Sequence, residues 1–219
     1  EPYRRQRQMC IRDRVEATKM TKQFTGLSGD ELKHFRNELQ ATADTYGKEF
    51  DELLQVVNNV AQQFGITHDD ALSKIQDGFQ AGADANGQYL DSLKEFPAYF
   101  KEAGLNADQF IALIAQANSM GIVSNKALDT IKEANIRLRE MSDTTSKSLK
   151  AIGLDATKIQ QELANGTTTT FEIIQQVSEK LDTLPASSKV VGEAIANIFG
   201  GPGQDAGLQY LTTVSYTHL

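Results

Sequence analysis

One short segment recurs along this chain: a glycine, a large aliphatic residue and then a residue whose side chain caps a helix. Glycine ends a helix in the left-handed conformation without a Cβ clash. The aliphatic residue can pack on the following helix, and the capping oxygen accepts one of its free backbone N–H groups. This corner motif predicts a tandem run of short helices. It occurs at Gly26-Leu27-Ser28, Gly65-Ile66-Thr67, Gly104-Leu105-Asn106, Gly153-Leu154-Asp155 and, with the cap delayed by one residue, Gly121-Ile122-Val123-Ser124.

Several caps are followed, three residues later, by a side chain that can bond back to the backbone of the cap. In such a capping box, two side chains satisfy two backbone donors reciprocally. We expect capping boxes at Ser28–Glu31 and Thr169–Glu172, and poorer versions at Thr67–Asp70 and Asn106–Gln109.

Apolar residues after Ser28 follow the three-four alternation of a coiled-coil heptad as far as Phe64. Two consecutive steps of four meet at Tyr46 and Phe50, beside Gly47, and such a stutter locally unwinds a supercoil. The pattern predicts one long coiled-coil-like helix of about 35 residues with an unwound midpoint, through which the chain could self-associate.

After residue 64, the apolar pattern predicts shorter helices over 68–81, 88–102, 107–119 and 125–142. Pro97 should kink or break the second of these. Residues 143–152 are only weakly helical in composition, and further helices are expected from Thr169, from Pro185 and after the Gly200–Gly203 stop. Two-residue alternation is not sustained anywhere, so no sheet is expected. The predicted class is all-α: a long helix followed by a compact array of short helices with Gly corners. Its core should include Phe79, Leu93, Leu113, Ile114, Leu128 and Ile131.

Both ends of the chain look like translated sequencing-adapter sequence, read in opposite orientations. Residues 9–14 spell MCIRDR and residues 214–219 spell VSYTHL. We therefore expect residues 1–14 and 214–219 to be artefacts, and the reading frame to continue beyond both. The alternative is a genuine basic amphipathic N-terminus that binds a membrane or nucleic acid. Removing residues 1–14 takes away the only cysteine, Cys10, and changes the net charge from −7 to −10.

Charge and hydropathy limit the kinds of partner. A net negative chain without clustered Lys and Arg argues against direct nucleic-acid binding. The longest apolar run, 110–115, is too short to span a membrane, so membrane contact is expected only through missing flanks.

Residues that could carry chemistry do not form a recognisable site. His34 and His68 lie in different predicted helices without a neighbouring ligand. Asp84-Ala85-Asn86-Gly87 resembles the middle of a calcium loop, but Gly82 and Leu93 occupy the positions of required acids. Phe199–Gly203 lacks the Gly-Lys-Ser/Thr ending of a phosphate loop. We predict no catalytic, cofactor-binding or metal residues, no cofactor and no enzymatic activity.

The stretch from Phe64 to about Leu211 resembles the core region of phage tail tape measure proteins. The resemblance rests on an ordered set of segments: the FGITHDDALSKI helix opener and AG turn, LKEFPAYFKEAGLNADQF, KALDTIKEANIRLRE, AIGLDATKI and the closing IFGGPGQDAGLQYL. Residues 15–63 fit the coiled-coil segment that commonly flanks such cores. The resulting domains are a helical segment over 15–64, a core over 65–152 and further short core helices over 153–213.

The resemblance implies a structural protein that spans the growing tail tube, sets its length and accompanies DNA ejection. It also implies tail tube, tail terminator and baseplate proteins and tail assembly chaperones as partners. The location would be the tail lumen of the virion, after assembly in the bacterial host cytoplasm. The alternative is a helical bacterial signalling or adaptor/scaffold protein without enzymatic activity. Long uninterrupted heptads would favour that alternative, and the glycine corners after residue 64 count against it.

Overall fold

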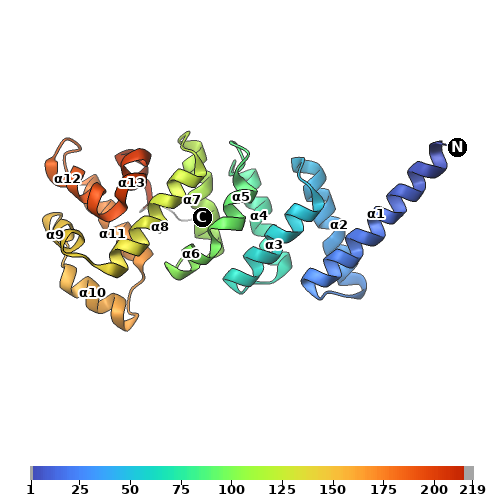
Figure 1. Cartoon of the computed structure of the whole chain (residues 1–219), viewed down its shortest axis with the longest axis horizontal. Helices are drawn as coiled ribbons and strands as arrows, with labels where there is room; N and C mark the ends of the chain where they lie inside the picture. Colours follow the sequence, from blue (N-terminus) through green and yellow to red (C-terminus); the bar gives the residue numbers. More distant parts are fainter. Residues whose placement is uncertain (1, 215–219) are drawn as a thin grey trace. The chain divides into compact units, whose positions relative to one another are not determined.

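The computed structural model describes residues 2–214, with side chains from Arg14 onward. Over this range the chain forms fourteen α-helices and one π-helix without a strand, which confirms the all-α class (Figure 1). The chain divides into two compact units, Glu1–Phe79 and Gln80–Leu219, and each is described separately.

The first unit contains α1 (Pro2–Thr25), α2 (Gly29–Tyr46), α3 (Phe50–Phe64) and nearly all of α4 (His68–Gln80). The single long helix predicted up to residue 64 is therefore wrong. The chain leaves α2 through Gly47, which is left-handed at φ 63°, and α3 starts three residues later. α2 and α3 pack against each other, so they bury the apolar stripe that a coiled coil would offer to a partner.

In the same unit α1 packs against both α2 and α3, and α4 packs through mixed polar and aromatic contacts. The rings of Tyr46 and Phe79 stack at 4.2 Å between centroids. Close by, Gln76 Nε2 donates to the Oγ1 of Thr42 at 2.7 Å. Both contacts join the C-terminal half of α2 to α4, so α4 covers a face of the α2–α3 hairpin.

In the second unit α8 is the central helix. It packs against α5, α7, α11, the π-helix η1 and α13. Its buried stripe includes Leu128, Ile131 and Leu138. The elements are α5 (Tyr89–Glu95), α6 (Pro97–Glu102), α7 (Ala107–Ser119), α8 (Ser124–Glu140), α9 (Asp143–Ala151), α10 (Ala156–Asn165), α11 (Thr170–Asp182), α12 (Lys189–Ala194), η1 (Ile195–Phe199), α13 (Gly200–Ala206) and α14 (Leu208–Thr213).

The predicted core side chains are all buried, and the break at Pro97 is confirmed because Pro97 opens α6.

Other local predictions need correction. Residues 143–151 form a regular helix, because the Ser142 hydroxyl accepts the backbone N–H of Thr145. The helix expected from Pro185 begins at Lys189, capped by Ser188. The glycine-rich stop ends one helix at Phe199 but is itself helical, since Gly200–Ala206 is α13.

The expected adapter segments stay a prediction. The backbone of residues 2–13 belongs to α1, and the side chain of Val214 is fully buried. Residues 215–219, and with them most of the second segment, lie outside the described residues. The domain boundaries at 64/65 and 152/153 also stay predictions.

Candidate functional site

The residues that resemble part of a calcium loop are engaged in turn and corner contacts. Asp84 Oδ1 accepts the backbone N–H of Tyr89 at 3.2 Å, and Asn86 Oδ1 accepts that of Gln88 at 3.0 Å. The Asn86 amide donates to the Ser124 hydroxyl at 3.2 Å, which donates onward to Asn118 Oδ1 at 3.1 Å. These side chains fasten the 81–88 turn to the start of α8.

The two histidines of the helical region have different partners. His34 is exposed on α2, with its Nε2 3.7 Å from Glu38 Oε1. His68 opens α4, where its Nε2 lies 3.1 Å from Asn58 Oδ1 and its ring meets Phe35 edge-on at 6.2 Å. Burial lowers the pKa of His68, and the carboxylate of Asp69 opposes this shift. Within the described residues, no group of three or more His, Cys, Asp or Glu could hold a metal ion.

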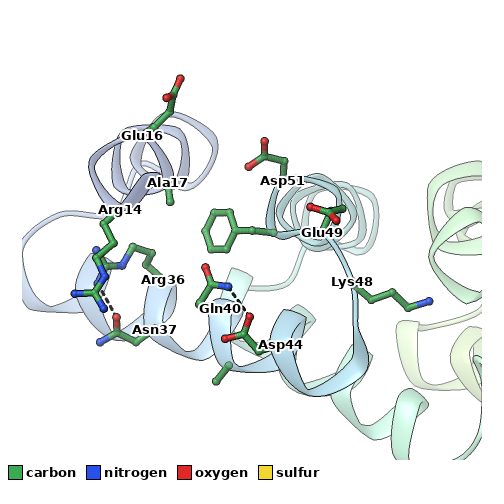
Figure 2. A pocket seen from close by; sticks show the side chains of 12 residues that line it. Arg14, Glu16, Ala17, Arg36, Asn37, Gln40, Asp44, Lys48, Glu49 and Asp51 are labelled. Atoms are coloured by element: carbon green, nitrogen blue, oxygen red, sulfur yellow. Dashed lines mark hydrogen bonds between the residues drawn. The ribbon is translucent and has the colours of Figure 1, made fainter. Parts of the chain in front are cut away.

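A charged groove of about 1180 Å³ lies in the first unit (Figure 2). It is bordered by α1, the exposed face of α2 and the start of α3. The Arg36 guanidinium donates to Thr18 Oγ1 at 2.9 Å and to Asn37 Oδ1 at 2.6 Å. Both signs of charge line the walls, so the groove suits a polar partner of mixed charge. The charged residues are Arg14, Glu16, Arg36, Asp44, Lys48, Glu49 and Asp51.

A second, smaller hollow of about 420 Å³ lies where α10 begins and ends. Asp155 Oδ1 accepts the backbone N–H groups of Thr157 and Lys158 at 3.0 and 3.1 Å. The Thr168 hydroxyl donates to Glu172 Oε2 at 2.7 Å, and this bond, with the backbone N–H of Thr169, lowers the pKa of Glu172. The polar side chains therefore serve mainly as helix caps.

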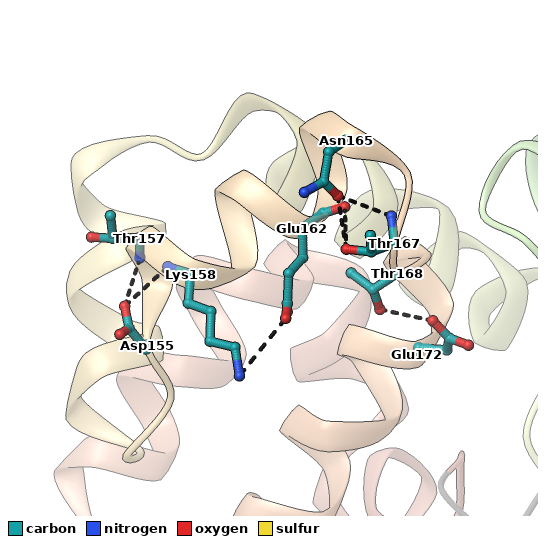
Figure 3. A network of polar contacts seen from close by, with 8 residues as sticks. All are labelled: Asp155, Thr157, Lys158, Glu162, Asn165, Thr167, Thr168 and Glu172. Atoms are coloured by element: carbon teal, nitrogen blue, oxygen red, sulfur yellow. Dashed lines mark hydrogen bonds and ion pairs between the residues drawn. The ribbon is translucent and has the colours of Figure 1, made fainter.

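Asn165, the first residue of an Asn-Gly-Thr sequence at 165–167, is likewise engaged within its turn. Asn165 Oδ1 accepts both the backbone N–H of Thr167, at 3.0 Å, and its hydroxyl, at 2.7 Å (Figure 3). The triplet therefore serves to close the turn between α10 and α11.

A third surface joins α6 to α8. The ammonium of Lys132 lies 4.7 Å from the centre of the Tyr99 ring and 5.7 Å from that of Phe96. Further along both helices, Arg139 forms an ion pair with Glu102. These contacts place a cation and an ion pair across one helix–helix junction. The sequence did not predict these contacts, because the partners are 33 or more residues apart.

The fold and these surfaces define an all-helical protein built from hairpins that presents charged grooves and helix faces. No described helix is long and apolar enough to cross a membrane. The sequence matches the model of the phage-related minor tail protein family over residues 11–200. The chain therefore belongs to the phage-related minor tail protein family. No curated protein and no solved structure matches the chain.

Proposed function

We propose that this chain is part of a tape measure protein that lies in the lumen of a phage tail and sets tail length during assembly. The observation that carries the proposal is the family match over residues 11–200, which spans nearly all of the described helices. Tail tube, tail terminator and baseplate proteins and tail assembly chaperones are the proposed partners. A role in DNA ejection follows from the same assignment.

The chemistry of the chain supports a structural role beside DNA. The net charge of −7 gives phosphate no general attraction, so DNA leaving through the same lumen would not be retained. The groove in the first unit carries both signs of charge, which suits contact with a protein surface. A helical adaptor or scaffold is the competing account, and it requires no relation between chain length and tail length.

The decisive experiment removes the α2–α3 hairpin, residues 27–65, in the phage that encodes this chain. The deletion joins Gly26 directly to Ile66 and Thr67, so a corner motif is rebuilt at the junction. A ruler predicts shorter tails in electron micrographs. The expected loss is about 10 Å if helix pairs stay stacked, or about 60 Å if the 39 residues form continuous helix at 1.5 Å per residue.

A length-neutral variant in the same hairpin, His34→Gln at an exposed site, is the control and should keep parental tails. Infectious virions with parental tail length after the deletion would overturn the ruler and favour the scaffold account.

A further inference from the structure

Three of the corner motifs are equally spaced. Gly26, Gly65 and Gly104 lie 39 residues apart, and all three are left-handed, with φ of 71°, 69° and 97°. At the second and third of these motifs the aliphatic residue also closes the preceding helix, whereas Leu27 donates its backbone N–H to Thr25 Oγ1 at 3.2 Å. Ile66 donates its backbone N–H to the carbonyl of Ala61 at 3.1 Å, and Leu105 does the same to Phe100 at 3.0 Å. These six-to-one bonds are Schellman closures, in which the aliphatic side chain packs back on the helix it ends.

A second segment recurs with nearly the same period. Leu90–Glu95 reads LDSLKE and Leu128–Glu133 reads LDTIKE, 38 residues later. The related FDELLQ at Phe50–Gln55 precedes the first of these by 40 residues. In each segment an exposed or half-exposed aspartate follows an apolar residue, and the fourth residue is fully buried.

The two closest copies also match in their hydrogen bonds. Ser92 and Thr130 occupy the same position, both are fully buried, and each donates its hydroxyl to the carbonyl four residues earlier, at 3.0 and 2.8 Å. The next lysine of each copy pairs with the preceding aspartate, Lys94 with Asp91 and Lys132 with Asp129. The likeness therefore extends from sequence to local structure.

Equivalent helices pack on one another inside each unit. In the first unit α2 and α4, which both follow a corner motif, meet through the Tyr46–Phe79 stack. In the second unit α5 and α6 follow α4 in the sequence as α8 follows α7, and they contact α8 through Lys132 and Tyr99. In tandem helix-pair repeats, the first helix of one pair contacts the first helix of the next pair, and the second helix contacts the second.

We infer that residues 27–141 are three copies of one two-helix repeat: 27–65, 66–104 and 105–141. The third copy ends at Met141, the one left-handed residue other than glycine among those described. Its backbone N–H bonds to the carbonyl of Arg137 at 2.9 Å, and Ser142 then caps the next helix.

The 39-residue register also extends back into α1. α1 ends at the Gly26 corner and so holds the place of a second helix. The inner positions of its last turns carry Thr18, Thr21 and Thr25, which donate to carbonyls of their own helix. At matching positions α3 buries Val57, Val60 and Phe64. The register therefore places hydroxyl side chains on α1 where α3 carries apolar side chains.

The inference deepens the proposed function and rests on it in one respect: the repeat of 37–39 residues becomes the unit by which tail length changes. In a tandem array each copy contacts mainly its neighbours, so whole copies can be removed or added without destroying the rest. Fractions of a copy cannot, because they disturb the alternation of first and second helices along the chain.

The test uses the whole chain with residues 66–104 deleted, which joins Gly65 to Leu105 and Asn106 and so rebuilds a corner motif. We expect one cooperative thermal transition and the parental helical signal per residue in circular dichroism. The matched control deletes residues 66–87, which removes α4 but leaves α5, and should lose the cooperative transition. A whole-copy deletion that unfolds as readily as the half-copy deletion overturns the repeat.

Tail length is then measured in phage carrying the same whole-copy deletion and, separately, a duplication of residues 66–104. The repeat predicts that the duplication lengthens the tail by the amount that the deletion shortens it. If both purified variants fold cooperatively while both tails keep parental length, the ruler fails and the repeat stands. If the variants do not fold, the repeat fails whatever the tails show.

Discussion

The corners at Gly65 and Gly104 have the same local sequence pattern but different surroundings. A Cβ built on Gly65 would meet nothing within 4 Å, whereas one on Gly104 would lie 2.5 Å from the Cβ and Cγ2 of Thr169. The carbonyl next to Gly104, that of Ala103, also accepts the backbone N–H of Phe171 at 3.0 Å. A corner in the first unit is thus held by local bonds, while its counterpart in the second is also clamped by a distant segment.

Alanine at these two glycines should give the largest difference between the units. Gly65→Ala should lower the free energy of unfolding by about 1–2 kcal/mol, because alanine is strained in the left-handed backbone conformation. Gly104→Ala should lower the free energy of unfolding by a similar backbone cost and by about 1–3 kcal/mol more, because the added methyl group overlaps Thr169. Urea unfolding of both variants measures the difference, and equal losses would show that the Thr169 contact relaxes without cost.

Threonine-to-valine substitutions test the same contrast with a smaller expected effect. In the second unit the buried Thr170 hydroxyl donates to Asn135 Oδ1 and lies 3.3 Å from the carbonyl of Ala103. Thr170→Val leaves the buried Asn135 amide without this donor, at a cost of about 1–3 kcal/mol. Thr21 in the first unit is equally buried but donates to Ala17 of its own helix. Thr21→Val should change the free energy of unfolding by less than about 1 kcal/mol.

Denaturant titrations of the two valine variants give both values under one set of conditions. A larger loss for Thr21→Val than for Thr170→Val would contradict the view that long-range polar bonds hold the second unit.

Local rules predicted some of the helix starts correctly and missed others. The capping box at Thr169–Glu172 is confirmed, and the weaker candidate at Asn106–Gln109 forms both of its bonds. At Ser28 the expected box is wrong: the side chain makes no cap bond, and Gly29 directly after it is left-handed. Ser124 is not the cap of α8 either, because its hydroxyl is drawn to Asn118 and Val123 takes the cap position.

The long helix illustrates a limit of periodicity. Apolar spacing continues across Tyr46 and Phe50 whether the chain runs straight or folds back, because both arrangements bury the same stripe. Only the tertiary partner differs, and that partner is α3 itself. The groove of the first unit was equally hidden from the sequence, since its charges come from three separate segments.

The smallest effect concerns pH and lies in the first unit. Burial lowers the pKa of His68 in the folded chain below the usual value of 6.5, so the unfolded chain binds more protons there. The stability that neutral His68 contributes is therefore fully present above pH 6.5 and declines as the pH falls through 6.5 toward the lower folded pKa. Asp69 is the adjacent charge and limits the decline.

His68→Gln should flatten the pH dependence of the free energy of unfolding between neutrality and mild acid, as measured by urea titrations at several pH values. His34→Gln, at an exposed position on α2, is the matched control. A slope that survives His68→Gln would place the titrating group elsewhere.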